Sequence, residues 1–364
     1  MHSNRSHPRL FLAVCFCCAF LSPHVCPAQK NARSASAVDV RMITDEAEAV
    51  LFILDKRAAG RPIEEEDWQK VFSSEGYVRL KQRETGMKRP FEESDFKTFV
   101  LSPQLLERRK ALAETLEKWK KTDMAAGGRR ALKYLPAGAR IRAKIYPVIK
   151  PRDNSFVFDL KNDPAVFLYL NPEKPRDKFE NDVVHEMHHI GFGTACPTAR
   201  TSQQMERLPE NVQTVLKWTG AFGEGFAMLA AAGGPDIHPH SVSDPEERAR
   251  WDKDLANFND DLKRVERFFS DVLEGKLSEQ ETNETAFSFY GIQGPWYTVG
   301  WKMAVTIEKT HGRTALIECM CDQRKLFETY NRAARKQNGQ KRDEPLALWS
   351  ESLVKAVKRQ KPGR

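Results

Sequence analysis

The stretch Asn181–Gly191 reads NDVVHEMHHIG and contains the pattern HExxH. Residues four apart lie on one face of a helix, so the imidazoles of His185 and His189 can reach the same metal ion. Glu186 would then stand beside the metal's open coordination position, where its carboxylate can take a proton from a bound water. The pattern therefore predicts a helix that carries two zinc ligands and a general base.

A catalytic zinc ion takes three protein ligands and keeps one position open. A third histidine soon after HExxH is excluded, because Phe192 and Ala195 stand where the longer motif needs glycine and histidine. The later stretch Gly220–Ala227 (GAFGEGFA) offers Glu224, an acid among apolar and small residues. A carboxylate in such surroundings is costly unless it is paired or bound to metal. We therefore predict that Glu224 and the two histidines of HExxH hold one Zn²⁺ per chain.

A second histidine motif competes for the third position. His238 and His240 flank a proline in a loop, and two nearby histidines can also bind a metal. His188 is expected outside the site, since its place on the helix does not let it share one ion with both neighbours.

The segment Glu224–Ala227 (EGFA) is similar to the stretch that carries the zinc glutamate in M1-type aminopeptidases, a gluzincin family. Thirty-four residues separate His189 from Glu224, more than in those aminopeptidases, so the chain is not one of them. The wider pattern resembles a bacterial family of zinc-dependent peptidases whose substrates are unknown. That resemblance covers about residues 130–320 and includes Tyr134–Gly138 (YLPAG) and Gly294–Gly300 (GPWYTVG).

The resemblance implies a peptidase acting on a peptide or protein substrate. In gluzincins, a tyrosine or histidine from a later helix often stabilises the oxyanion. Tyr297 is the candidate for that role, with Tyr290 and His311 as alternatives.

The fold expected is mainly α, of the α+β class. Short strands are expected within Ala139–Ile149, Phe156–Leu160 and Ala165–Leu170, and the HExxH helix follows them directly. This order is found in zinc metallopeptidases, so we expect a zincin-like domain with a small antiparallel sheet over the HExxH helix. Downstream, long helices are expected, including 244–273 and 313–335.

Three segments are expected along the chain. In residues 1–28, Arg5 and Arg9 precede the apolar run Leu10–Leu21, and Ala28 offers a cleavage position, which is the layout of a signal peptide. Residues 29–128 read as an N-terminal helical segment with a flexible start at 29–40 and a hinge at Gly127-Gly128. Residues 129–364 form the zincin-like metallopeptidase domain. The mature protein is expected to be exported, periplasmic or extracellular, without a membrane span.

Composition narrows the function classes. The chain has 364 residues, a hydrophobic fraction of 40% and a formal charge of +8, values of a soluble globular protein. Basic residues alternate with acids and form no stripe with aromatics, so nucleic acid is not an expected partner. After Cys26, only Cys196, Cys319 and Cys321 remain. Buried thiols are the default expectation, and whether Cys196 pairs with either of the others is left open.

Two other function classes compete with the peptidase. One is a zincin-fold binding protein that has lost catalysis, but an intact Glu186 argues against it, because zinc binding alone does not need that residue. The other is a helical scaffold for acidic polymers, which rests only on the positive charge.

Overall fold

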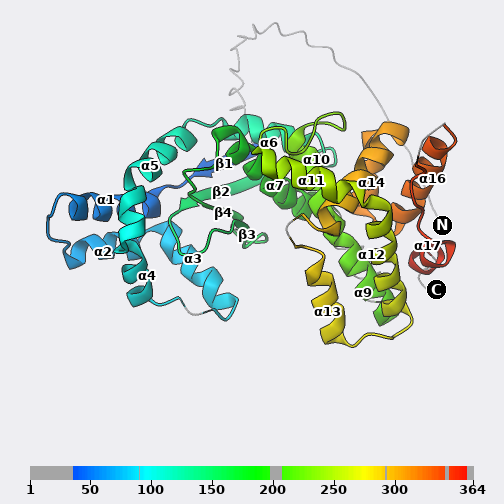
Figure 1. The fold of residues 1–364 in the computed structure, drawn as a ribbon, viewed down its shortest axis with the longest axis horizontal. Coiled ribbons are helices and arrows are strands. Elements are labelled where there is room, and N and C mark those ends of the chain that lie inside the picture. Colours follow the sequence, from blue (N-terminus) through cyan, green and yellow to red (C-terminus); the bar gives the residue numbers. More distant parts are fainter. Residues whose placement is uncertain (1–35, 90, 197–206, 292, 341–343, 359–364) are drawn as a thin grey trace, which may run out of the picture. The chain divides into compact units, whose positions relative to one another are not determined.

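A four-stranded mixed sheet organises the first half of the fold, in the order β1-β2-β4-β3 (Figure 1). The computed structural model describes residues 36–89, 91–196, 207–291, 293–340 and 344–358. The strands are β1 (Val38–Met42), β2 (Ile141–Val148), β3 (Phe156–Phe158) and β4 (Ala165–Tyr169). Only β3 and β4 pair antiparallel, while β2 lies parallel to both β1 and β4.

Two expectations about this sheet are wrong. The sheet is mixed rather than antiparallel, because the chain between β1 and β2 is long enough for the crossover that parallel neighbours need. Residues 38–40 also belong to a strand rather than to a flexible start, since they pair in register with Ile141–Ala143.

Six helices separate β1 from β2 and confirm the expected helical character of this part of the chain. They are α1 (Asp45–Ala58), α2 (Glu65–Phe72), α3 (Glu75–Gly86), α4 (Glu93–Val100), α5 (Pro103–Lys120) and α6 (Met124–Leu132). The expected hinge is wrong, because Gly127 and Gly128 lie inside α6. A Cβ on Gly128 would lie 2.5 Å from the side chain of Val38, and one on Gly127 would lie 3.0 Å from that of Val184. The two glycines therefore allow α6 to pack closely against β1 and α7. A domain boundary at residue 128 stays a prediction.

The two faces of the sheet bury different helices. On one face, Ile141 and Ile145 share a core with the apolar side of α7 (Arg176–Ala195), the helix that carries HExxH. On the other face, Tyr146 and Phe167 pack with Leu80 of α3. The HExxH helix therefore lies directly against the sheet, as expected.

Helices make up the described chain beyond α7, so the mainly α, α+β class is confirmed. The elements are α9 (Glu210–Thr219), η1 (Gly220–Phe222), α10 (Gly223–Ala232), α11 (Pro245–Ala256), α12 (Phe258–Leu273), α13 (Glu279–Ser288), α14 (Pro295–His311), α15 (Arg313–Cys321), η2 (Gln323–Lys325), α16 (Leu326–Asn338) and α17 (Glu351–Lys358). The expected continuous helices 244–273 and 313–335 are each interrupted, at Asn257 and near Asp322. These helices enclose a second core that includes Phe222, Trp296 and Trp349.

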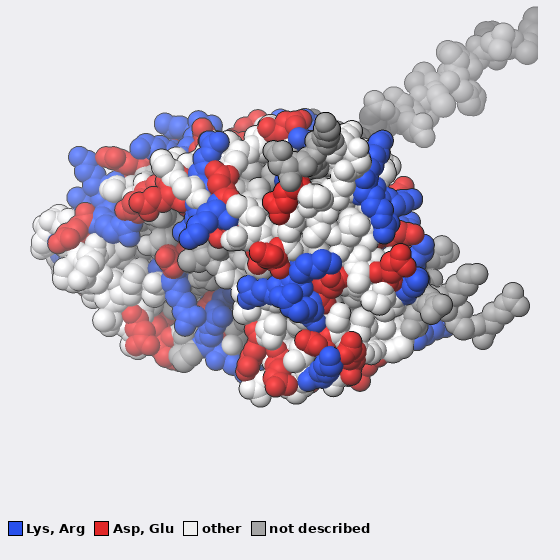
Figure 2. Space-filling model, turned by 45° about the vertical axis from the view of Figure 1, so that its right-hand side comes forward, with Lys and Arg blue, Asp and Glu red and all other residues white. Residues whose placement is uncertain are grey.

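Charged side chains of both signs are interspersed over the face shown in Figure 2. Within the described residues, no helix combines the length and apolar character that a bilayer crossing requires.

Candidate metal centre

Helix α7 turns its two motif histidines away from the core. Val184, Met187 and Ile190 are almost fully buried on the apolar side of the helix, against the sheet and the N-terminal helices. His185 and His189 are only partly buried, and their ring centroids lie 4.7 Å apart. The apolar residues of the motif therefore fix the rotation of α7 that presents both imidazoles together.

Helix α10 brings Glu224 to the same place through a close contact with α14. A Cβ on Gly225 would lie 2.0 Å from the backbone nitrogen of Trp301 and 2.5 Å from the carbonyl oxygen of Tyr297. Only glycine allows this approach, because any side chain would meet the backbone of α14. The glycine of the EGFA stretch thus determines how closely α10 approaches α14, and with it the position of Glu224.

The three candidate ligand atoms converge. Nε2 of His185 lies 3.1 Å from Nε2 of His189 and 3.1 Å from Oε2 of Glu224, and the remaining distance, from His189 to Glu224, is 3.5 Å. Ligand atoms bound to zinc at about 2.0–2.1 Å in a tetrahedron lie roughly 3.3 Å from one another. Among the described residues, no other group of three or more His, Cys, Asp or Glu side chains comes together in this way. The donor set and its spacing therefore fit a zinc ion.

The carboxylate of Glu224 dominates the electrostatics of the cluster. Burial favours the neutral acid of Glu224, but attraction and hydrogen bonds from the two histidines outweigh it and hold the pKa of this carboxyl well below its usual value. Burial also disfavours a charged His189, yet the carboxylate of Glu224 raises the pKa of His189 to about 9. Two imidazoles and a carboxylate thus form a site that attracts positive charge.

Glu186 lines a cavity of about 330 Å³ beside the cluster, together with His185, Tyr290 and Tyr297. Burial raises the pKa of Glu186, and the positive field of His185 and His189 opposes that rise. Among the described residues, no hydrogen bond or ion pair engages its carboxylate. The oxygens of Glu186 are therefore free to act on a molecule in the cavity.

Tyr297, the first candidate for the oxyanion role, lies beside the cluster. Its ring is nearly parallel to that of His185, with 6.4 Å between the centroids. Burial, and then the charge of Glu224, raise its pKa, so the phenol stays a hydrogen-bond donor. Tyr290 lines the same cavity, and the same two causes raise its pKa to about 12. His311 ends α14, and burial with the charges of α16 lowers its pKa.

His238 and His240 have partners outside the ligand cluster, although His240 also lines the cavity. His238 contacts Asp252 at 2.9 Å, and His240 contacts Ser243 and Gln293 at 2.9 and 2.8 Å. His188 faces the interior, where burial lowers its pKa to about 3. The structure therefore does not bring the competing HPH motif into the cluster, and it places His188 outside it.

The cavity also includes residues that the sequence did not single out. Lys178 and Asp182, 3.0 Å apart, come from the turns of α7 before the motif, and Gln293 and Ser155 come from distant loops. The spacing of Asp182, three residues before His185, places it on the same helix face and could have indicated it. Gln293 and Ser155 carry no such local signal.

A disulfide joins Cys196, at the end of α7, to Cys321, at the end of α15. The default expectation of buried thiols is thus wrong for these two residues, and it holds for Cys319. The bond ties the end of the HExxH helix to the helical half that carries Glu224 and Tyr297.

Comparison with known proteins supports a zinc site through a family match. No curated protein and no solved structure matches the chain. A sequence model of one family matches residues 67–339, from α2 to the end of α16, and so extends beyond the region of the sequence resemblance. By this match over most of its length, the chain belongs to the family described as "Putative zinc dependent peptidase (DUF5700)".

Proposed function

We propose that the protein is an exported zinc peptidase that cleaves peptide bonds in the cavity between α7 and α14. The convergence of His185, His189 and Glu224 to within 3.5 Å, with Glu186 in the adjoining cavity, carries this proposal. The family description supports zinc dependence and a peptide or protein substrate.

Each candidate residue has a separate role in the proposed hydrolysis. His185, His189 and Glu224 would hold Zn²⁺, which supplies a Lewis acid that activates water and polarises a carbonyl. Glu186 takes the proton of the attacking water and passes it to the amine that leaves as the C–N bond breaks. The phenol of Tyr297 donates a hydrogen bond to the oxygen that becomes negative in the transition state.

Export is proposed from the signal-peptide pattern in residues 1–28, which lie outside the described residues. The Cys196–Cys321 disulfide supports it, because such bonds persist in oxidising compartments and are rare in the cytosol. N-terminal sequencing of protein from its native host should show that the first residues are absent; an intact Met1 on cytosolic protein would overturn the export proposal.

The test of the enzymatic proposal measures zinc and cleavage together. The purified protein should contain about one zinc ion per chain and cleave members of a mixed peptide library. The His185→Ala/His189→Ala variant should lose both properties. A protein that binds zinc and cleaves nothing would instead be the zincin-fold binding protein considered from the sequence.

A further inference from the structure

A second hollow, here called the basic groove, lies away from the zinc site and has a volume of about 560 Å³. It is formed by the start of β2, the end of α7 and the turn before β4, and it shares no lining residue with the zinc cavity. Arg140, Arg142 and Lys161 line it, and all three are exposed. Among the described residues, no acidic side chain lines it, and none forms an ion pair with any of the three cations.

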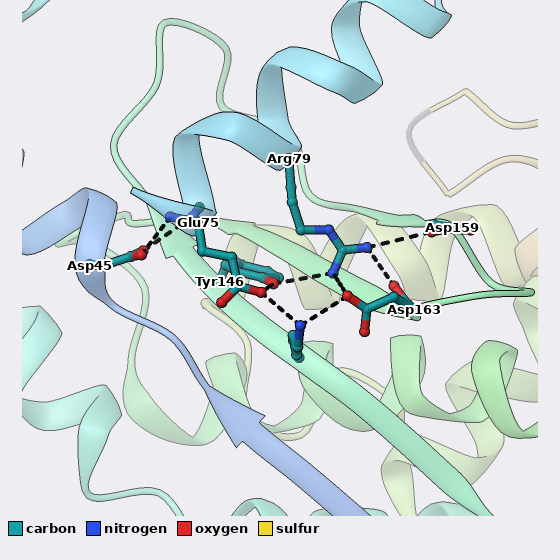
Figure 3. A network of polar contacts seen from close by, with 8 residues as sticks. Asp45, Glu75, Arg79, Tyr146, Asp159 and Asp163 are labelled. Carbon is teal, nitrogen blue, oxygen red and sulfur yellow. Dashed lines mark hydrogen bonds and ion pairs between the residues drawn. The ribbon is translucent and has the colours of Figure 1, made fainter. Parts of the chain in front are cut away.

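The acids nearest in sequence to Lys161 are held elsewhere. Asp159 and Asp163 both face Arg79 of α3, at 3.9 and 2.8 Å (Figure 3). Asp163 also contacts the ammonium of Lys144 at 2.9 Å, and the same lysine contacts Glu75 at 2.7 Å. This network neutralises the acids of the turn on the side of α3. The positive charge of the basic groove is therefore left uncompensated.

The pairing between β2 and β4 stops beside the groove. The ladder between β2 and β4 begins at Lys144, whose N–H donates to the carbonyl of Pro164. The N–H of Ile141 donates to the carbonyl of Ala37, just before β1, so by alternation the N–H and C=O of Arg142 point to the side of β4. Pro164 has no N–H to offer Arg142, and the ladder stops there. Among the described residues, the N–H and C=O of Arg142, which lines the groove, thus have no main-chain partner on the side of β4.

We propose that the basic groove binds an extended, acidic segment of another protein. The segment's main chain pairs with Arg142 as a short added strand, and its carboxylates meet Arg140, Arg142 and Lys161. An extended peptide fits both the positive charges and the unpaired main chain of Arg142. A polyphosphate or an acidic polysaccharide fits only the charges, because it lacks the regularly spaced peptide N–H and C=O groups that pair with a strand. The groove does not depend on zinc or on peptide cleavage.

The test measures the binding of a fluorescent peptide that alternates glutamate with valine, by anisotropy at low salt. The protein used is the zinc-loaded Glu186→Gln variant, so that cleavage does not interfere. Reversal of two groove charges, in Arg140→Glu/Arg142→Glu, should weaken binding about ten-fold or more. The matched control is Arg61→Glu/Lys253→Glu, which reverses two exposed cations that form no ion pair with a described residue, and it should bind within about two-fold of the parent.

Three further binding measurements test whether the ligand of the groove is an extended acidic peptide. A peptide of the same sequence with N-methylated backbone amides should bind several-fold more weakly, and a lysine–valine peptide should not bind. Equal binding by the charge-reversed variant or by the N-methylated peptide would overturn the proposal. Tighter binding of inorganic polyphosphate, lost in the same variant, would overturn the peptide assignment in favour of a general anion site. None of these outcomes bears on the peptidase proposal, because the variant used is designed not to cleave.

Discussion

Gly225 of α10 and Gly300 of α14 meet where these two helices cross, and a Cβ on Gly300 would lie 3.3 Å from the Cα of Gly225 and 2.6 Å from the carbonyl oxygen of Phe222. One glycine follows the candidate ligand Glu224, and the other lies three residues after Tyr297. The two motifs that suggested a peptidase from the sequence thus contact each other, and their glycines set the spacing between a candidate ligand and a candidate catalytic group.

Gly225→Ala should therefore lower both stability and zinc content. The new methyl group would meet backbone atoms of α14, which cannot move aside as a side chain can. We expect a loss of about 2–4 kcal/mol in the free energy of unfolding, measured by denaturant titration. Gly223→Ala is the matched control on the same helix, since its Cβ would meet nothing within 4 Å, and it should be neutral or slightly stabilising. Equal stability of the two variants would show that the helix crossing tolerates a side chain.

Glu186 and Glu224 should respond differently to substitution. Glu186→Gln keeps the size of the side chain but cannot accept a proton, so turnover should fall about hundred- to ten-thousand-fold while zinc is retained. Glu224→Ala removes one of three converging ligand atoms, so zinc and turnover should fall together. Elemental analysis and peptide cleavage on the same preparations check both. Full activity of Glu186→Gln would refute its role as base, and full zinc in Glu224→Ala would point to a different third ligand.

Tyr297→Phe should reduce kcat with little change in KM or zinc content. The phenol is proposed to donate to the oxyanion, and removing one such donor costs about hundred- to thousand-fold in rate. Tyr290→Phe is the control, because its hydroxyl belongs to the same cavity and is expected to change kcat by no more than about three-fold. If the larger effect appears at Tyr290, the roles of the two tyrosines are reversed.

Glu46 should make stability fall as pH rises. Its side chain is 1% exposed, and one oxygen accepts from the N–H of Ile149 at 3.0 Å. Burial raises the pKa of Glu46 from the usual 4.5 to about 8. Between those two pH values the folded state keeps a proton that the unfolded state has lost. The free energy of unfolding therefore decreases through this window, by at most about 1.4 kcal/mol per pH unit from this group, and levels off above pH 8.

Glu46→Gln should remove that dependence. Thermal unfolding between about pH 5 and 9 should show a Tm advantage for the variant that grows with pH and is smallest at the acid end. Glu48→Gln, on the same helix, should show no such growth, because its half-exposed carboxylate pairs with Lys120 and its pKa is lowered. A parallel pH profile for Glu46→Gln and the parent would mean that Glu46 is ionised in the folded state.

The sequence predicted what depends on local spacing. The interval between His185 and His189 indicated one helix face, and the two imidazoles do lie together on one side of α7. The helical character expected for residues 29–128 is likewise confirmed by α1 to α6. These features follow from helix geometry alone.

Contacts between residues far apart in the chain could not be predicted from local spacing. The alternation in Val38–Met42 is that of a strand, but its partner lies about one hundred residues later, and nothing local indicates parallel pairing. Gly127 and Gly128 were interpreted as a hinge, since the sequence does not show the valines that lie against them. Gln293 and Ser155 reach the cavity through tertiary packing, so no spacing in the chain could have placed them there.

The Cys196–Cys321 bond closes a covalent ring of the chain with a sequence separation of 125 residues. Glu224 and Tyr297 lie inside this ring, while His185, Glu186 and His189 lie just outside it. A single backbone cut anywhere between the two cysteines would open the ring without releasing a fragment. The nicked protein would then keep His185, His189 and Glu224 on one covalently linked molecule, and the cut would be visible on a denaturing gel only under reducing conditions.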